Sequence, residues 1–179
     1  VMATQNPIEQ EGTYPLPEAQ LDRFLMHVRI DFPKAAEELE ILRLTRGEAL
    51  QNTPLEASNP LSQEAIFAAR KEILQLHLSE PLEQYIVELI IASREPNRYG
   101  EDIAQWVQFG ASPRATIALD RCARAHAWLQ GRDYVSPEDI HAVAHNVLRH
   151  RILLSFEAEA EGVTSDQLID ELLNRVPVP

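Results

Sequence analysis

The sequence predicts a mainly α-helical fold in which two short strands precede a bundle of about five to seven helices. Two observations carry this prediction. Alternation of apolar and polar residues is confined to the start of the chain, within residues 1–33. Beyond that point apolar residues recur at three- and four-residue spacing, which is the period of an amphipathic helix. The chain has 179 residues, of which 45% are hydrophobic, so it can bury a sizeable core.

Both predicted strands lie before Pro33. The first is the short apolar segment that delivers Asn6 to a loop. The second covers residues 24–32, where period-two alternation places on one face Phe24, Met26, Val28, Ile30 and Phe32. Because the chain opens inside a strand-to-loop unit, we expect it to be the later part of a longer protein.

The next elements are predicted to be helices separated by one loop. The pattern favours a helix over residues 35–43 and a loop over residues 45–60, which contain a glycine and two prolines. A second helix follows Ser62, with an apolar stripe of Ile66, Ala69, Ile73 and Leu76. Pro81 suits the first turn of a third helix, whose apolar face consists of Leu82, Tyr85, Ile86, Leu89 and Ile90.

Three later helices have explicit capping signals. Ser112 precedes a first-turn proline, Ser136 is followed by Asp139 at the third helical position, and Thr164 begins the capping run Thr164-Ser165-Asp166-Gln167. The predicted apolar faces are, in order, Ala115, Ala118, Cys122, Ala125 and Leu129; Ile140, Val143, Ala144, Val147 and Leu148; and Leu168, Ile169, Leu172 and Leu173. The short segment 149–156 between the last two helices is predicted to be extended, and residues 95–110 begin irregularly.

Composition excludes several classes of protein. The net charge is −12, from 28 acidic and 16 basic residues, and no cluster of Lys or Arg is present to bind a nucleic acid backbone. The single cysteine, Cys122, excludes an internal disulfide, and no apolar run approaches the roughly 20 residues of a membrane helix. No secretory leader precedes the first strand. We therefore expect a cytoplasmic protein without nucleic acid partners.

Asn6, Arg23 and Arg114 are the polar residues that carry a hypothesis of function. Asn6 follows a strand, where its amide can contact a phosphate or a water, although Asn-Pro is also a common turn. Arg23 could serve a site or pair locally with Asp22 or Glu18. Arg114 lies in the first turn of a helix, where a cation opposes the helix dipole. Either a bound anion or an acidic side chain would explain it.

Other possible sites have weaker patterns. His141 and His145 share a helix face, but no third metal ligand is indicated, so structural roles are favoured. Cys122 lies on an apolar stripe and is interpreted as a core residue. Residues 167–171 resemble a magnesium-binding strand but continue in a helical pattern. Neither Lys34 nor Lys71 follows a glycine, so the phosphate-binding P-loop lysine is absent from this chain.

Together, several segments closely resemble the MoxR family of AAA+ ATPases. The first is the run from Ala3 to Phe24, which contains Ala-Thr-Gln-Asn-Pro and Leu-Asp-Arg-Phe. The others are residues 110–115, residues 131–139 and His150-Arg151. This resemblance covers nearly the whole chain. It implies that residues 1–33 are the end of the α/β nucleotide-binding core and that residues 34–179 are a helical lid.

The resemblance also implies roles for the three candidates. Asn6 corresponds to sensor 1, which orients the attacking water, and Arg114 to sensor 2, which reaches the nucleotide of its own subunit. Arg23 corresponds to the arginine finger, which completes the site of a neighbouring subunit in a ring, usually a hexamer. ATP and Mg²⁺ would serve the longer protein, whose Walker A and Walker B residues should lie upstream of Val1.

The function implied is ATP-driven remodelling or maturation of client proteins, often with a von Willebrand factor A domain partner. This chain alone is expected to bind no ATP tightly and to hydrolyse none. The competing interpretation is a helical interaction module without nucleotide chemistry.

Overall fold

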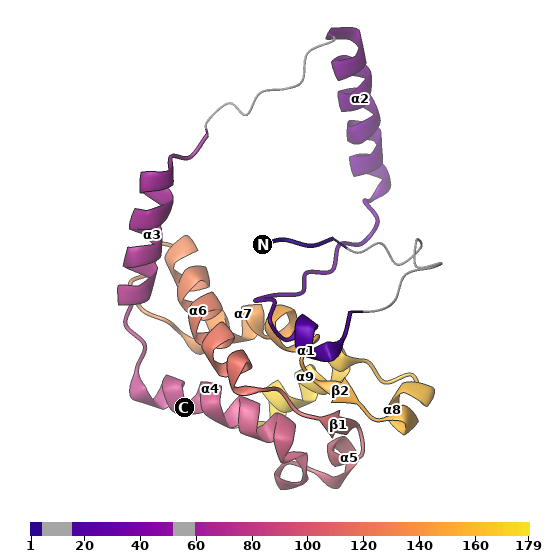
Figure 1. Ribbon diagram of the computed structural model, residues 1–179, viewed down its shortest axis with the longest axis vertical. Coiled ribbons are helices and arrows are strands. Elements are labelled where there is room, and N and C mark those ends of the chain that lie inside the picture. Colours follow the sequence, from indigo (N-terminus) through magenta and orange to yellow (C-terminus); the bar gives the residue numbers. More distant parts are fainter. Residues whose placement is uncertain (5–15, 52–59) are drawn as a thin grey trace. The chain divides into compact units, whose positions relative to one another are not determined.

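The computed structural model describes residues 1–4, 16–51 and 60–179 and divides them between two units (Figure 1). One unit combines Val1–His27 with Leu76–Pro179, and the other consists of Val28–Gln75. Both are mainly helical, as the sequence predicts. Across the described ranges, no helix combines the length and the apolar character that crossing a membrane requires.

The larger unit is a helical bundle with a small two-stranded sheet. A short helix, α1, covers Glu18–Leu21, and the longest helices of the unit are α4 (Glu80–Arg94), α6 (Pro113–Leu129), α7 (Pro137–Leu148) and α9 (Ser165–Arg175). Shorter elements connect them, namely η2 (Pro96–Arg98), α5 (Glu101–Ala104), β1 (Val107–Phe109), β2 (Leu153–Leu154) and α8 (Phe156–Ala160).

The core of this unit forms where α6 and α7 pack together, with α4 and α9 beside them. The predicted faces of α4 and α7 are fully confirmed as buried, and Leu168, Ile169 and Leu172 of α9 are buried too. On α6 the prediction is wrong for Leu129, which is 73% exposed. Leu129 is the last residue of its helix, beyond the buried positions Leu119, Ala123 and Ala127. The small residues of α6 let neighbouring helices approach closely.

The predicted capping residues all serve their helices. Ser112 accepts a hydrogen bond from the Arg114 amide at 3.2 Å. The Ser136 amide donates to Asp139 Oδ2 at 2.8 Å. At α9, the Thr164 hydroxyl accepts from the Gln167 amide at 3.2 Å, and Gln167 Oε1 accepts from the Thr164 amide at 2.8 Å. Each bond satisfies a donor that the helix itself leaves unpaired.

The two-stranded sheet lies elsewhere than predicted. β1 and β2 pair antiparallel, with Val107 opposite Leu154 and Phe109 opposite Leu153. The predicted strand over residues 24–32 is wrong, because these residues form no ladder. Alternation favours an extended chain, but a strand also needs a neighbouring strand to accept its hydrogen bonds, and no described segment pairs with residues 24–32. Of the first predicted strand, Val1–Thr4 show no strand, and Gln5 lies outside the described residues.

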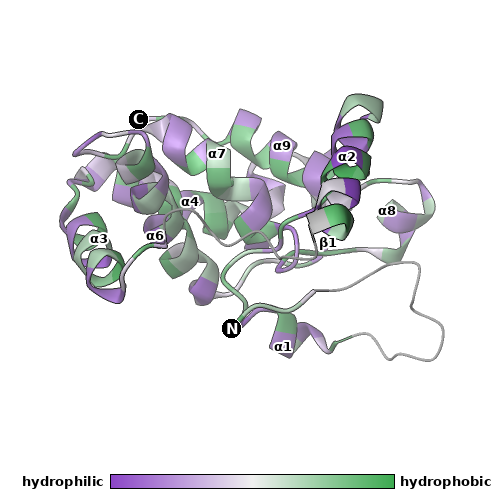
Figure 2. Cartoon of the chain, turned by 90° about the horizontal axis from the view of Figure 1, so that it is seen from above, coloured by the Kyte–Doolittle hydropathy of each residue, from purple (hydrophilic) through white to green (hydrophobic). Residues whose placement is uncertain are grey.

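The smaller unit contains two helices, α2 (Ala35–Gln51) and α3 (Gln63–Gln75). Helix α2 continues past the predicted end at Arg43 and through Gly47, so the predicted loop over residues 45–60 is wrong in its first part. Thr45 fits this helix because its hydroxyl donates to the carbonyl oxygens of Ile41 and Leu42. Helix α3 begins after Ser62 as predicted. Figure 2 shows hydrophobic and hydrophilic residues mixed along α2.

Candidate functional site

Arg23 lies in the turn that ends helix α1. The amide of Arg23 donates to the Gln20 carbonyl at 3.1 Å, and the amide of Phe24 donates to the Leu21 carbonyl at 3.0 Å. The chain therefore leaves the helix through a hydrogen-bonded turn, and the Arg23 side chain is exposed to solvent. Within the described part of the chain, Arg23 forms no ion pair, so the local pairing considered from the sequence is not observed. Asn6 lies outside the described residues.

Arg114 lies one residue into α6, after Pro113. Its guanidinium is 56% exposed and forms an ion pair with Asp22, at 2.8 Å between Nη1 and Oδ2. The sequence leaves two explanations for a cation at this helix start, a bound anion or an acidic side chain. In the structure an acidic side chain, Asp22, lies next to it. Since the Arg114 side chain is more than half exposed, water competes for its bond to Asp22, and Arg114 can exchange Asp22 for a stronger anion.

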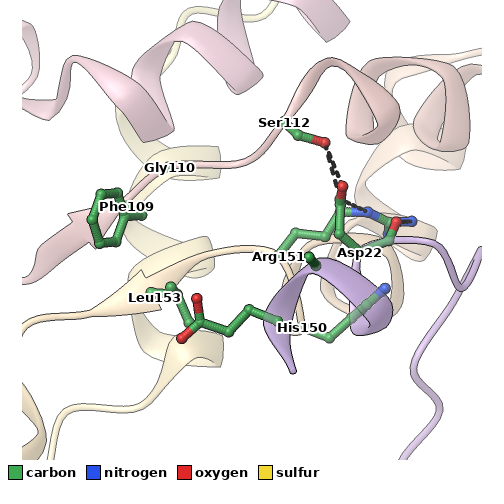
Figure 3. A pocket seen from close by; sticks show the side chains of 9 residues that line it. Asp22, Phe109, Gly110, Ser112, His150, Arg151 and Leu153 are labelled. Atoms are coloured by element: carbon green, nitrogen blue, oxygen red, sulfur yellow. Dashed lines mark hydrogen bonds and ion pairs between the residues drawn. The ribbon is translucent and has the colours of Figure 1, made fainter. Parts of the chain in front are cut away.

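Asp22 is the centre of the site, and the sequence did not single it out. The Ser112 hydroxyl donates its one proton to the Asp22 carboxylate, whose two oxygens both lie 2.9 Å from Ser112 Oγ (Figure 3). Arg151 Nε donates to Oδ1 at 3.2 Å. Burial acts to raise the pKa of Asp22, but hydrogen bonds from Arg114 and Ser112 and the charge of Arg151 outweigh it and lower the pKa below its usual value. Asp22 is therefore an anion at neutral pH.

Arg151 is the buried cation of the site, with a side chain only 2% exposed. Besides the Asp22 carboxylate, its Nη2 donates to the carbonyl oxygens of Asp22, at 3.3 Å, and of Phe24. Its Nη1 donates to the carbonyl oxygens of Leu25, at 3.2 Å, and of Val147. A buried guanidinium needs such partners because its donors have left water. Arg151 thus holds the carbonyl groups on both sides of Arg23.

His150 adds another bond to the same turn. Its Nε2 lies 3.1 Å from the Phe24 carbonyl and donates to it, and its ring meets the ring of His27 edge-on at 5.9 Å. Burial is the main cause that lowers the pKa of His150 to about 4, and the charge of Arg151 lowers it further. His150 is therefore neutral at pH 7 and contributes a hydrogen bond rather than a charge.

The loop before α6 is fixed against α4. The Ala111 amide donates to Ser93 Oγ at 3.0 Å, and Arg94 Nε donates to the Ala111 carbonyl at 2.7 Å. Gly110 packs so closely that a Cβ there would lie 2.3 Å from the Ser93 carbonyl oxygen. A side chain at this position would displace backbone. Ser112 and Arg114 consequently start from a rigid support.

A shallow pocket of about 270 Å³ lies between α1 and this loop (Figure 3). Asp22, Ser112, His150 and Arg151 line it together with the aromatic ring of Phe109. Its volume is below the roughly 300–1,000 Å³ of ordinary ligand sites. Two exposed arginines lie near this pocket in the chain: Arg114 pairs with the Asp22 carboxylate, and Arg23 directly follows Asp22 in sequence.

The other sequence candidates have separate partners. His141 Nε2 lies 2.8 Å from the Tyr85 hydroxyl, and His145 Nε2 lies 2.9 Å from Asp170 Oδ1. Cys122 is buried, and burial raises the pKa of its thiol. Within the described residues, no three His, Cys, Asp or Glu side chains gather as metal ligands. Residues 167–171 are helical, as the pattern indicates.

The sequence reveals Arg23 and Arg114 but misses the residues that join them, Asp22, Ser112 and Arg151. One signal was available for Arg151. It follows Arg149 and His150 between apolar residues, and a cation in such a run needs a buried partner. Nothing local could show that this partner lies 129 residues earlier in the chain.

Comparison with known proteins shows that two segments which contribute residues to this site each match a known family profile. A family profile for the AAA lid domain matches residues 101–172, which include Arg114 and Arg151. A profile for the ATPase family associated with various cellular activities (AAA) matches residues 1–26, which include Asp22 and Arg23. The ion pairs of Asp22 therefore join the two matched regions.

Individual relatives extend over the whole chain. The chaperone MoxR1 of Mycobacterium tuberculosis is 40% identical across 100% of this chain, which covers 46% of that relative. The protein YeaC of Bacillus subtilis is 41% identical across 100% of the chain, which covers 52% of it. A crystal structure described as an ATPase, from Cytophaga hutchinsonii, is 44% identical with a TM-score of 0.88, covering 98% of this chain and 52% of that one. The chain thus spans about half the length of these proteins.

Proposed function

Because this chain belongs to the MoxR family of AAA+ ATPases, we propose that it acts as part of a longer ATPase and supplies the helical lid and the end of the nucleotide-binding core. Residues 1–33 would be the core segment and residues 34–179 the lid. This chain covers about half the length of each relative. The other half of such a protein can carry the phosphate-binding lysine that this chain lacks, which supports the proposal that the chain is one part of a longer ATPase.

In the proposed protein, Arg114 acts as sensor 2 and binds the phosphates of ATP, and Arg23 acts as an arginine finger at the site of a neighbouring subunit. Asn6 acts as sensor 1. The observation that carries this proposal is the exposed guanidinium of Arg114 at the start of α6, held by a weak ion pair beside the turn of Arg23. The positive end of the helix dipole and a guanidinium both favour an anion.

The residues present fit the triphosphate of ATP better than they fit its metal ion. Arg114 and Arg23 would hold phosphate oxygens and stabilise the charge that develops during phosphoryl transfer. Mg²⁺, when bound with ATP, neutralises phosphate charge, and its ligands would come from the part of the protein outside this chain. By itself the 179-residue chain should neither bind ATP tightly nor hydrolyse it.

The test is the replacement Arg23→Ala in the full-length protein. ATP hydrolysis should fall by about 10³ to 10⁵, because a trans arginine contributes that much to phosphoryl transfer, while nucleotide affinity remains. The matched control is Arg98→Ala, since Arg98 is also an exposed arginine, and it pairs with Glu95, at 2.9 Å. Normal turnover by the Arg23 variant would refute the arginine-finger role.

For the physiological role we propose that ATP hydrolysis in a ring oligomer remodels or matures client proteins, together with a von Willebrand factor A domain partner. The name of the Mycobacterium tuberculosis relative, chaperone MoxR1, supports a chaperone-like activity. Size-exclusion chromatography of the full-length protein with and without ATP tests the ring. A protein that stays monomeric with ATP would contradict it.

A further inference from the structure

One buried side chain, that of Arg151, binds the turn that carries Arg23 at several backbone positions. This guanidinium donates to the carbonyl groups of Asp22 and Phe24, the residues immediately before and after Arg23, and to Leu25 beyond them. It also donates to Val147 of helix α7. The path of the backbone through Arg23 is therefore fixed relative to a lid helix, although Arg23 itself points into solvent.

Asp22 completes this attachment with two kinds of partner. Arg151 and Ser112 hold its carboxylate from the buried side, where water competes little for the bonds. Arg114 holds it from the exposed side and is half open to solvent. If Arg114 turns to a phosphate, the bonds from Arg151 and Ser112 are sufficient to keep Asp22, and so the Arg23 turn, in place.

We propose that Asp22 and Arg151 are positioning residues that set the direction of Arg23 and thereby control the rate of phosphoryl transfer at the neighbouring subunit. This rests on the proposed role of Arg23 as the arginine finger. An arginine finger acts only when its guanidinium meets the phosphate at the right place, and a displacement of about 1 Å can cost about 100-fold in rate. Residues that hold the supporting backbone in place are then needed for the full effect of the arginine.

The experiment uses Asp22→Asn and Arg151→Gln in the full-length protein. Asparagine keeps the shape of Asp22 but loses both ion pairs, so kcat should fall by about 100-fold. Nucleotide affinity should be equal or tighter, because Arg114 no longer has an acidic competitor. Arg151→Gln should lower kcat in the same way. A fall in affinity with kcat unchanged would overturn the proposal.

Arg175→Gln is the matched control. Arg175 also binds carboxylates, Asp102 at 2.6 Å and Glu171 at 2.7 Å, and also donates to a carbonyl, that of Tyr99, but it makes none of the contacts to the Arg23 turn. Its replacement should leave kcat near the wild-type value. An equal loss of kcat in this variant would show that any damaged ion pair of the lid slows the enzyme and would overturn the specific role.

A double variant separates positioning from general damage. If Asp22 acts through Arg23, then Asp22→Asn combined with Arg23→Ala should lose no more rate than Arg23→Ala alone, measured by single-turnover hydrolysis. A further 100-fold loss would overturn the proposal.

Should Arg23→Ala itself be fully active, the proposed function fails. Should Arg23→Ala be inactive while Asp22→Asn is normal, only the positioning role fails. If Arg151→Gln does not fold, Asp22→Asn decides.

Discussion

The residues from Leu76 to Pro179 and the residues from Val28 to Gln75 use helices in different ways. In the first region, α7 buries Ile140, Ala144 and Val147 completely. In the second, α2 leaves each of its leucines and its isoleucine about half exposed or more, at 46–88%. Both segments are helical, and among the described residues the buried core cluster is formed by the first. Helix formation and helix packing are therefore separate properties of this chain.

The order of apolar residues explains the difference. On α7 the apolar positions recur at spacings of three and four, so they form one stripe. On α2 the apolar residues Leu39, Ile41, Leu42 and Leu44 follow one another too closely to share a face. Helical stability in proteins comes mostly from packing of one apolar face, so α2 depends more on its intrinsic helix propensity.

The largest expected effect compares a core leucine with an α2 leucine. Leu119→Ala removes a side chain that is fully buried between helices and should lower the free energy of unfolding by about 2–5 kcal/mol. Leu42→Ala removes a half-exposed side chain and should cost less than about 1 kcal/mol. Urea denaturation followed by circular dichroism measures both. An equal loss of unfolding free energy in the two variants would mean that α2 is packed in solution and would contradict the difference between the two regions.

The second expected effect is an acid sensitivity that His150 gives to the larger unit. His150 has a pKa lowered to about 4, so the folded state binds fewer protons than the unfolded state. Its contribution to stability is full above its ordinary value of 6.5 and is lost as the pH falls toward about 4. Residues 28–75 contain no histidine.

Thermal denaturation across this pH range should therefore show a falling midpoint for the wild type and a smaller fall for His150→Asn. Asparagine can still donate to the Phe24 carbonyl but does not titrate. The groups around the ring are Arg151, His27 and Asp22, and Asp22 stays charged through most of this range because its pKa is lowered. An unchanged slope in the variant would assign the acid sensitivity to another group.

The third prediction compares helix caps. Thr164→Ala removes the hydroxyl that accepts from Gln167, and it should lower the stability of the bundle by about 1 kcal/mol. Ser62→Ala removes the equivalent bond at α3, where Ser62 Oγ accepts from the Ala65 amide at 3.1 Å. Helix α3 has no buried residues, so its unfolding should not disturb the core of the larger unit. The unfolding midpoint of that unit should therefore be the same in Ser62→Ala and in the wild type. Matching shifts of the midpoint would show that the two regions unfold as one unit.

The difference between the two regions also explains which features could be predicted from the sequence. Where apolar stripes and caps agree, as at Ser136 or Thr164, the predicted helices and faces are confirmed. Where they disagree, the predictions fail. Gly47 favours a loop in the sequence pattern, but one glycine costs only about 1 kcal/mol and does not end α2. Alternation over residues 24–32 indicated a strand, but alternation cannot supply the partner strand.

The site shows a related limit. Arg114 could be selected from local sequence because it opposes a helix dipole, whereas the hypothesis for Arg23 rests on the resemblance of the Leu-Asp-Arg-Phe segment to the MoxR family. Their connection through Asp22 spans 92 residues between Asp22 and Arg114 and is set by tertiary packing. No periodicity or spacing encodes such a contact. Asp22 could be named from the sequence only as a local partner for Arg23, a role it does not have in the structure.

The smallest expected effect tests whether α2 relies on helix propensity. Gly47 lies inside α2, and a Cβ at this position would meet no atom within 4 Å. Gly47→Ala should therefore add helix content and stabilise α2 by up to about 1 kcal/mol, because alanine loses less conformational entropy in a helix. Hydrogen exchange of the α2 amides measures this local effect.

A matched change in the larger unit tests the same point. Gly131 follows α6 with a φ of +73°, so Gly131→Ala introduces strain although space is available. Alanine should slow hydrogen exchange at position 47 and accelerate it around position 131. If Gly47→Ala leaves exchange in α2 unchanged, then propensity does not limit this helix, and contacts that half-exposed side chains make must hold it together instead.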